Sequence, residues 1–108
     1  MSNWWLDQDQ YGSRLDATNK GQGYYGPLLG NNGQTSTELS FGFNHNGKEY
    51  LAPLLVPGLD IEEIYHLLSG RKPTATIYQK AQQFAIQRQL MGKPMFARPF
   101  DLIRLPQK

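Results

Sequence analysis

The stretch from Ser40 to Leu54 constrains the fold more than any other part of this 108-residue chain. Apolar and polar residues alternate through "SFGFNH", and alternate again through "KEYLA" after Asn46-Gly47. Asn-Gly is the preferred dipeptide of a two-residue type I′ turn between antiparallel strands. This turn sets a register that places the following apolar pairs on one face: Leu39 with Leu54, Phe41 with Ala52, and Phe43 with Tyr50. The turn and the face pattern agree, so the sequence predicts an antiparallel β-hairpin with one buried face.

A first helix is expected directly after the hairpin, because Pro57-Gly58 interrupts the strand pattern. Asp60 and Glu63 have the spacing of a capping box, in which each side chain binds the other residue's backbone N–H. Apolar residues then recur at helical spacing as far as Leu68, and Gly70 is a typical helix terminator.

A second helix is expected from a cap at Thr74 or Thr76 to about Met91, with Gly92 after it. Its apolar stripe consists of Ile77, Ala81, Phe84, Ala85 and Met91. The small alanines allow the helix to lie close to the hairpin or to the first helix. The sequence therefore predicts an α+β core over residues 36–92, made of one hairpin packed on two helices.

The two ends of the chain are predicted to be extended arms. Residues 1–35 are rich in Gly, Asn and Gln without a sustained period, and residues 93–108 contain three prolines that exclude a long helix. The aromatic residues of the N-terminal arm are costly to leave in water, so this arm is expected to dock either on its own core or on a neighbouring subunit. The C-terminal arm carries apolar residues between basic ones and is expected to be a second docking arm. The predicted protein contacts are Trp4, Trp5, Tyr11, Tyr24, Tyr25, Phe96, Arg98, Phe100 and Arg104.

Charge is distributed unevenly along the chain. Residues 1–70 contain three basic and eight acidic residues, a net charge of −5, whereas residues 71–108 contain eight basic residues and one acidic residue, a net charge of +7. Such polarity favours head-to-tail contacts between copies, or an acidic partner for the basic end. Uneven surface charge without a partner explains the same numbers.

Several classes of site are disfavoured by the sequence. Cysteine is absent, which excludes disulfides and thiolate metal sites, and no apolar run approaches the roughly 20 residues of a membrane span. His45 and His66 lack a second metal ligand at standard spacing. The glycines of "GQGYYG" match a dinucleotide-binding pattern in letters, but neither a strand before them nor a helix after them is expected. We therefore predict no enzyme activity, no cofactor and no metal.

Four segments together resemble a small domain that recurs among proteins of tailed bacteriophages: "GQGYYGPL", "STELSFGFN", "NGKEYLAPLLVPGLDIEEIYHLL" and "KAQQFAIQRQLMGKPMF". This chain has Ala-Pro-Leu where those proteins commonly have Ile-Pro-Thr. The resemblance covers roughly residues 21 to 97 and carries no catalytic residues.

The resemblance implies a structural component of the virion, bound in several copies to other virion proteins at the tail, the portal or connector, or the capsid. The alternative is a small phage-encoded protein that is directed at the host or binds nucleic acid. In that case the basic C-terminal third would make a weak DNA contact, with Phe96 and Phe100 placed to stack on bases.

Overall fold

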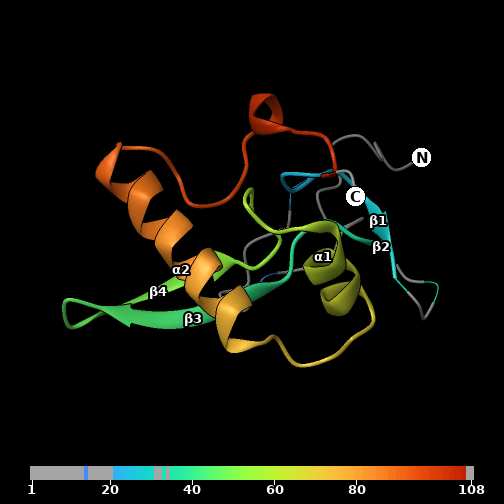
Figure 1. Ribbon diagram of the computed structural model, residues 1–108. Coiled ribbons are helices and arrows are strands. Elements are labelled where there is room, and N and C mark those ends of the chain that lie inside the picture. The colour runs from blue at the N-terminus through green and yellow to red at the C-terminus, as the bar shows by residue number, and fades with distance from the viewer. Residues whose placement is uncertain (1–13, 15–20, 31–32, 34, 107–108) are drawn as a thin grey trace, which may run out of the picture.

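The computed structural model describes residues 14, 21–30, 33 and 35–106 (Figure 1). In chain order its elements are β1 (Leu28–Leu29), β2 (Thr35–Ser36), β3 (Ser40–His45), β4 (Lys48–Pro53), α1 (Ile61–Leu68), α2 (Ala75–Leu90) and the short 3₁₀ helix η3 (Pro99–Asp101). Two antiparallel two-stranded sheets accompany two α-helices, which confirms the predicted α+β class. The second sheet, β1–β2, is an addition to that prediction.

Strands β3 and β4 form the predicted hairpin in the predicted register. Phe43 lies opposite Tyr50 and Phe41 opposite Ala52. Asn46 and Gly47 both have positive φ, 54° and 79°, as a type I′ turn requires. The hairpin runs alongside α2 (Figure 1), and the Phe41 ring lies 5.6 Å from the Tyr78 ring on that helix. The buried face is therefore the one that the alternation predicts.

The helix ends also follow the local signals in the sequence. The Asp60 side chain accepts a hydrogen bond from Glu63 N at 2.8 Å, and Asp60 N donates to the Glu63 carboxylate at 2.9 Å, which completes the capping box. Thr74, not Thr76, caps α2 by accepting from Ile77 N at 3.2 Å. Gly70 follows α1 with a φ of 81°, a value that glycine adopts without steric cost.

The buried face of α2 differs from the predicted stripe at its C-terminal end. The buried residues of this helix are Ile77, Ala81, Ala85 and Arg88. Met91 is 56% exposed, because the helix ends at Leu90 and Met91 is its C-terminal cap. A charged residue therefore occupies the last inward position of the helix.

Part of the predicted N-terminal arm belongs to the core. Tyr24, Tyr25 and Leu28 are buried in the same cluster as Leu55, and the β1–β2 ladder ties residues 28–29 to residues 35–36. The folded unit therefore includes residues on the N-terminal side of the core boundary that the sequence predicted at residue 36.

Glu38 also departs from the alternation, which places it on the polar face of the hairpin. Its side chain is 1% exposed, and its carboxylate accepts hydrogen bonds from Arg14 Nε at 2.5 Å and from Gly21 N at 3.3 Å. A carboxylate is rarely buried without a cationic or hydrogen-bonding partner, and here the N-terminal segment supplies both.

Candidate interaction surface

Tyr24 and Tyr25, predicted as interface residues, lie inside the protein instead. They are 2% and 9% exposed. The Tyr24 hydroxyl donates to the Met95 carbonyl at 2.7 Å, and the Tyr25 hydroxyl donates to the Val56 carbonyl at 2.6 Å. Loss of hydration on burial raises the pKa of each hydroxyl to about 12. Both tyrosines are therefore core residues with satisfied hydroxyl groups, which corrects the prediction of an interface at these two positions.

The other predicted contact residues fall into two groups. Trp4, Trp5 and Tyr11 lie outside the described residues. Phe96, Arg98, Phe100 and Arg104 lie together on the segment that follows α2. Phe96 is half-buried, and the Arg14 guanidinium lies 4.1 Å from the centre of its ring. Phe100 is 76% exposed and carries the Arg98 guanidinium 4.4 Å from the centre of its ring. Of these four residues, Phe100 and Arg104 are the exposed ones.

The segment after α2 is held in place by backbone and side-chain hydrogen bonds from the N-terminal segment. Ile103 N donates to the Tyr24 carbonyl at 2.7 Å, and Gln22 Nε2 donates to the Pro99 carbonyl at 2.9 Å. Together with the hydrogen bond from the Tyr24 hydroxyl to Met95, these bonds join residues 22–24 to residues 95–103. Figure 1 shows the C-terminal segment returning from the end of α2 across one side of the molecule toward β1.

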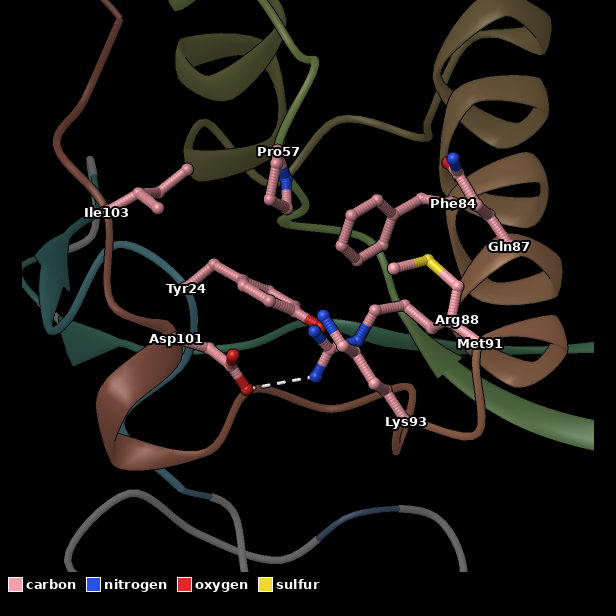
Figure 2. A pocket seen from close by; sticks show the side chains of 9 residues that line it. All are labelled: Tyr24, Pro57, Phe84, Gln87, Arg88, Met91, Lys93, Asp101 and Ile103. Atoms are coloured by element: carbon pink, nitrogen blue, oxygen red, sulfur yellow. Dashed lines mark hydrogen bonds and ion pairs between the residues drawn. The ribbon is translucent and has the colours of Figure 1, made fainter.

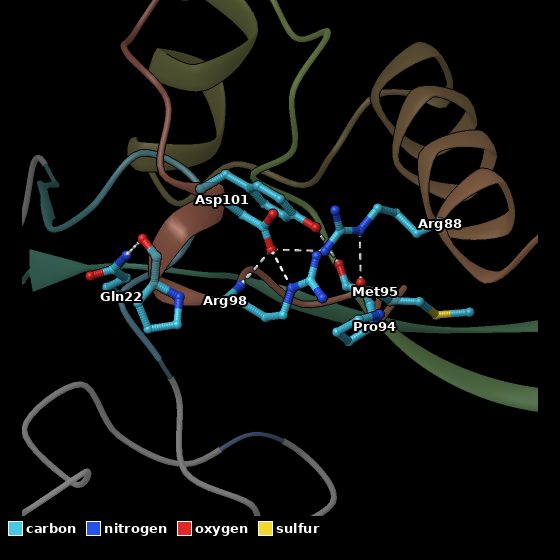
Figure 3. Close-up of polar contacts among 8 residues, drawn as sticks. Gln22, Arg88, Pro94, Met95, Arg98 and Asp101 are labelled. Atoms are coloured by element: carbon cyan, nitrogen blue, oxygen red, sulfur yellow. Dashed lines mark hydrogen bonds and ion pairs between the residues drawn. The ribbon is translucent and has the colours of Figure 1, made fainter. Parts of the chain in front are cut away.

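Arg88 ties the end of α2 to this segment. Its side chain is 9% exposed, its Nε donates to the Pro94 carbonyl at 2.7 Å, and its Nη2 donates to Asp101 Oδ2 at 2.9 Å. Asp101 Oδ2 also accepts from Arg98 Nε at 3.0 Å and from Arg98 N at 2.9 Å (Figure 3). The hydrogen bonds from Arg98, then those from Arg88, hold the pKa of the Asp101 carboxyl well below its usual range.

A pocket of about 320 Å³ opens beside this ion-pair cluster. Its lining residues come from α2, from the C-terminal segment, from the N-terminal segment and from the end of the hairpin connection: Tyr24, Pro57, Phe84, Gln87, Arg88, Met91, Lys93, Asp101 and Ile103. In Figure 2, Phe84 and Arg88 reach from α2, and Met91 from the C-terminal cap of that helix, toward Tyr24, while Asp101 faces them from the C-terminal segment. The walls are mainly apolar, and charged groups stand on one side.

Most of the exposed large apolar side chains lie at the end of α2 and on the C-terminal segment. Eight large apolar residues of the described chain are exposed, and six of them lie between residues 90 and 105. We call these six the C-terminal surface: Leu90, Met91, Phe100, Leu102, Ile103 and Leu105. Leu90 is 83% exposed, the largest value among them. Single exposed apolar residues are ordinary. Six of them within sixteen consecutive positions make this segment the candidate interaction surface.

The remaining candidates from the sequence have structural roles. His66 Nε2 donates to the Lys72 carbonyl at 2.8 Å, and Glu63 combines its capping bond with an ion pair to Lys80 at 2.7 Å. Within the described residues, no group of three or more His, Cys, Asp or Glu side chains is arranged to hold a metal ion. Among the same residues, no helix is long and apolar enough to cross a membrane.

The glycine-rich stretch also has a structural explanation. Gly23 has a φ of 76°, and a Cβ at this position would lie 1.8 Å from the Thr37 carbonyl oxygen. The stretch is followed by β1 rather than by a helix. Its glycines therefore carry Tyr24 and Tyr25 into the core, and a phosphate-binding helix N-terminus is not formed there.

Sequence reasoning missed Arg88, Lys93 and Asp101 as members of one site. The missed signal was helical spacing, because Arg88 continues the buried series 77, 81, 85 on α2. A second signal was that Asp101 is the one acidic residue after position 70. Comparisons of the chain with protein-family models, with curated proteins and with solved structures found no match.

Proposed function

We propose that this protein is a non-enzymatic subunit of a larger assembly and binds neighbouring proteins through its C-terminal surface. One observation carries the proposal: six of the eight exposed large apolar side chains lie between residues 90 and 105. Interfaces of assembled subunits combine an apolar centre with polar and charged residues at the rim. Lys93, Arg98 and Arg104 are interleaved with the six apolar residues and supply such a rim.

The way this segment is held supports an interface. Because Arg88, Tyr24 and Gln22 bind its backbone or side chains, its apolar groups are presented on an ordered scaffold. An ordered surface loses less conformational entropy on binding than a flexible tail does. The Arg98–Asp101 bonds also fix the turn that displays Phe100.

The assembly that we propose is the particle of a tailed bacteriophage. This part of the proposal is supported by the resemblance of residues 21–97 to small virion-associated proteins. The partners would be other virion proteins at the tail, the portal or connector, or the capsid, and several copies would be bound in a symmetric arrangement. The chain would accordingly be found in the virion.

The test is incorporation of surface variants into particles. Leu90→Gln and Phe100→Ser remove the two most exposed side chains of the C-terminal surface, at 83% and 76% exposure, with little effect on folding. Tyr65→Ser is the matched control, since Tyr65 is 59% exposed on α1, outside that surface. We expect the double variant to be depleted from purified particles by about ten-fold or more, which corresponds to ~1.4 kcal/mol of binding. Normal incorporation of a folded double variant would contradict the proposal.

A second function, weak binding of single-stranded nucleic acid, is favoured by one observation. Phe100 presents an exposed ring with the Arg98 guanidinium 4.4 Å from its centre, the combination on which bases stack. Binding to phosphates weakens steeply as salt rises. A chain that does not bind an oligonucleotide at 20–50 mM salt, a range in which such contacts are strong, would exclude this function.

A further inference from the structure

The pocket beside Arg88 has unused hydrogen-bonding groups. Arg88 Nε and Nη2 are bonded to Pro94 and Asp101, whereas Nη1 has no hydrogen-bond partner among the described residues. The Lys93 ammonium likewise has no ion pair with any residue that the structure describes. The two groups line the same pocket, with Tyr24, Phe84, Met91 and Ile103 as its apolar walls.

The charges around the pocket do not cancel. The single carboxylate of Asp101 is shared between Arg88 and Arg98. Lys93 adds a third positive charge, so the cluster carries a net charge of +2 with Arg88 largely withdrawn from water. Arg88 is buried and Lys93 is exposed, so the positive charge extends from the pocket wall to solvent, where the carboxylate of an incoming segment can reach it. The occupant that fits is therefore an apolar or aromatic group accompanied by negative charge.

The chain itself contains such a sequence. Trp4-Trp5-Leu6-Asp7-Gln8-Asp9 joins three large apolar side chains to two carboxylates within six residues. We propose that the pocket binds this aromatic-acidic segment from a second copy of the chain, an inference that rests on the proposed role in an assembly. One tryptophan enters between the apolar walls, and the carboxylates of Asp7 and Asp9 pair with Lys93 and with the free edge of Arg88.

Tryptophan suits this pocket for two reasons. The volume of about 320 Å³ is at the lower end of the range for ligand sites, ~300–1,000 Å³, and takes one large side chain. Tryptophan is also the best partner for a cation at a ring face, and the Arg88 guanidinium already lies 5.6 Å and 6.0 Å from the ring centres of Tyr24 and Phe84.

A second copy is the source that we propose, because exposed apolar residues are the chain neighbours of the lining residues Met91, Asp101 and Ile103. Leu90, Phe100 and Leu102 are 83%, 76% and 51% exposed on the elements that line it. A neighbouring copy brings its own body as well as its N-terminal segment. The net charges of −5 for residues 1–70 and +7 for residues 71–108 favour this head-to-tail contact.

The experiment uses a synthetic peptide of residues 2–10, labelled at its C-terminal end, and the full-length chain carrying Trp4→Ala and Trp5→Ala as receptor. Binding is measured by fluorescence anisotropy. We expect saturable binding in the micromolar range, with at least ten-fold weaker affinity for a receptor that also carries Lys93→Glu. Lys72→Glu is the matched control, because Lys72 is an exposed residue between α1 and α2, and we expect no change. A peptide with Asp7→Lys and Asp9→Lys should bind the Lys93→Glu receptor better than the unaltered peptide does.

Equal affinity for the Lys93→Glu and Lys72→Glu receptors, or no binding at 1 mM receptor, would overturn the assignment. Sedimentation of the unaltered chain tests whether the bound segment comes from a second copy. Self-association that is lost with Trp4→Ala and Trp5→Ala supports a second copy. A chain that stays monomeric at all concentrations overturns the assignment to a second copy. If the peptide fails to bind while the Leu90→Gln, Phe100→Ser variant is still depleted from particles, this inference falls and the proposed function stands.

Discussion

Replacement of Gly23 by alanine is the substitution whose effect the structure defines most sharply. The φ of Gly23 is 76°, and an added Cβ would lie 1.8 Å from the Thr37 carbonyl oxygen and 2.7 Å from its carbonyl carbon. A side chain at positive φ costs roughly 1–2 kcal/mol by itself. The overlap with backbone atoms adds to this cost, because neither the oxygen nor the carbon belongs to a flexible side chain.

The overlap can be relieved only if the two backbones separate. Separation displaces Tyr24, which is 2% exposed, and shifts Thr37, the residue before Glu38. Complete loss of a buried aromatic side chain costs about 3–5 kcal/mol, and partial displacement costs a fraction of this. We therefore expect Gly23→Ala to lower the free energy of unfolding by about 3 kcal/mol or more, a large part of the ~5–15 kcal/mol of a typical domain.

Gly70→Ala is the control that separates the two contributions. Gly70 has a φ of 81°, close to that of Gly23, but nothing lies within 4 Å of an added Cβ there. Its cost should stay near the ~1–2 kcal/mol of the backbone conformation alone. Both variants are measured by urea denaturation followed by circular dichroism. Equal losses for Gly23→Ala and Gly70→Ala would refute the close approach of residue 23 to residue 37.

Three further predictions concern caps and titration. Asp60→Ala should cost about 1 kcal/mol through loss of the capping box, which lowers the Tm by roughly 4–8 °C; an unchanged Tm contradicts the cap. Burial raises the pKa of Tyr24 and Tyr25 from 10.0 to about 12, so these hydroxyls ionise in the unfolded chain before they ionise in the folded one. The free energy of unfolding should therefore fall between pH 10 and 12 by roughly 2–3 kcal/mol for each tyrosine. Equal denaturation midpoints at the two ends of this pH range would rule out this effect. Since the pKa of the Asp101 carboxyl is depressed in the folded chain, its contribution to the free energy of unfolding is complete above about pH 5 and is lost as the pH falls below its ordinary pKa of about 4. Asp101→Asn should therefore lose less stability in acid than the unaltered chain does. Identical acid profiles of the two proteins would contradict the ion pair with Arg88.

The features that the sequence predicted correctly are local ones. The hairpin register follows from Asn46-Gly47 and the alternation around it, and the start of α1 follows from Asp60 and Glu63. In each case the residues that determine the structure lie within a few positions of one another. Turn chemistry and capping therefore suffice to specify these elements without knowledge of the rest of the fold.

The features that the sequence did not predict depend on contacts between distant segments. Tyr24 is a core residue because its hydroxyl meets the Met95 carbonyl, 71 positions later, and because its ring packs against Phe84. Glu38 is buried because Arg14 and Gly21 come to it from the N-terminal side. A polar residue at an inward position is informative only once its partner is known.

The contact residues of the C-terminal segment stay a prediction, and the pocket was not predicted because it depends on distant segments. Phe100 and Arg104 are exposed on the C-terminal segment, where the sequence placed contact residues. The pocket beside Arg88 is formed by α2, the C-terminal segment and Tyr24, and no local sequence pattern predicts that these distant segments lie together. The sequence shows that many of residues 90–105 are apolar. It does not show that their side chains are exposed on a segment fixed by hydrogen bonds to Arg88 and to the N-terminal segment.

Quantitative mass spectrometry of particles purified from the source of this chain, which we propose is a tailed bacteriophage, tests the central claim most directly. The copy number is measured relative to the portal protein, whose ring has a fixed number of subunits. A subunit of the particle should be present at a reproducible number of copies that matches a ring or fibre symmetry. Absence of the chain from the particles, or a trace amount without a fixed ratio, would contradict the account.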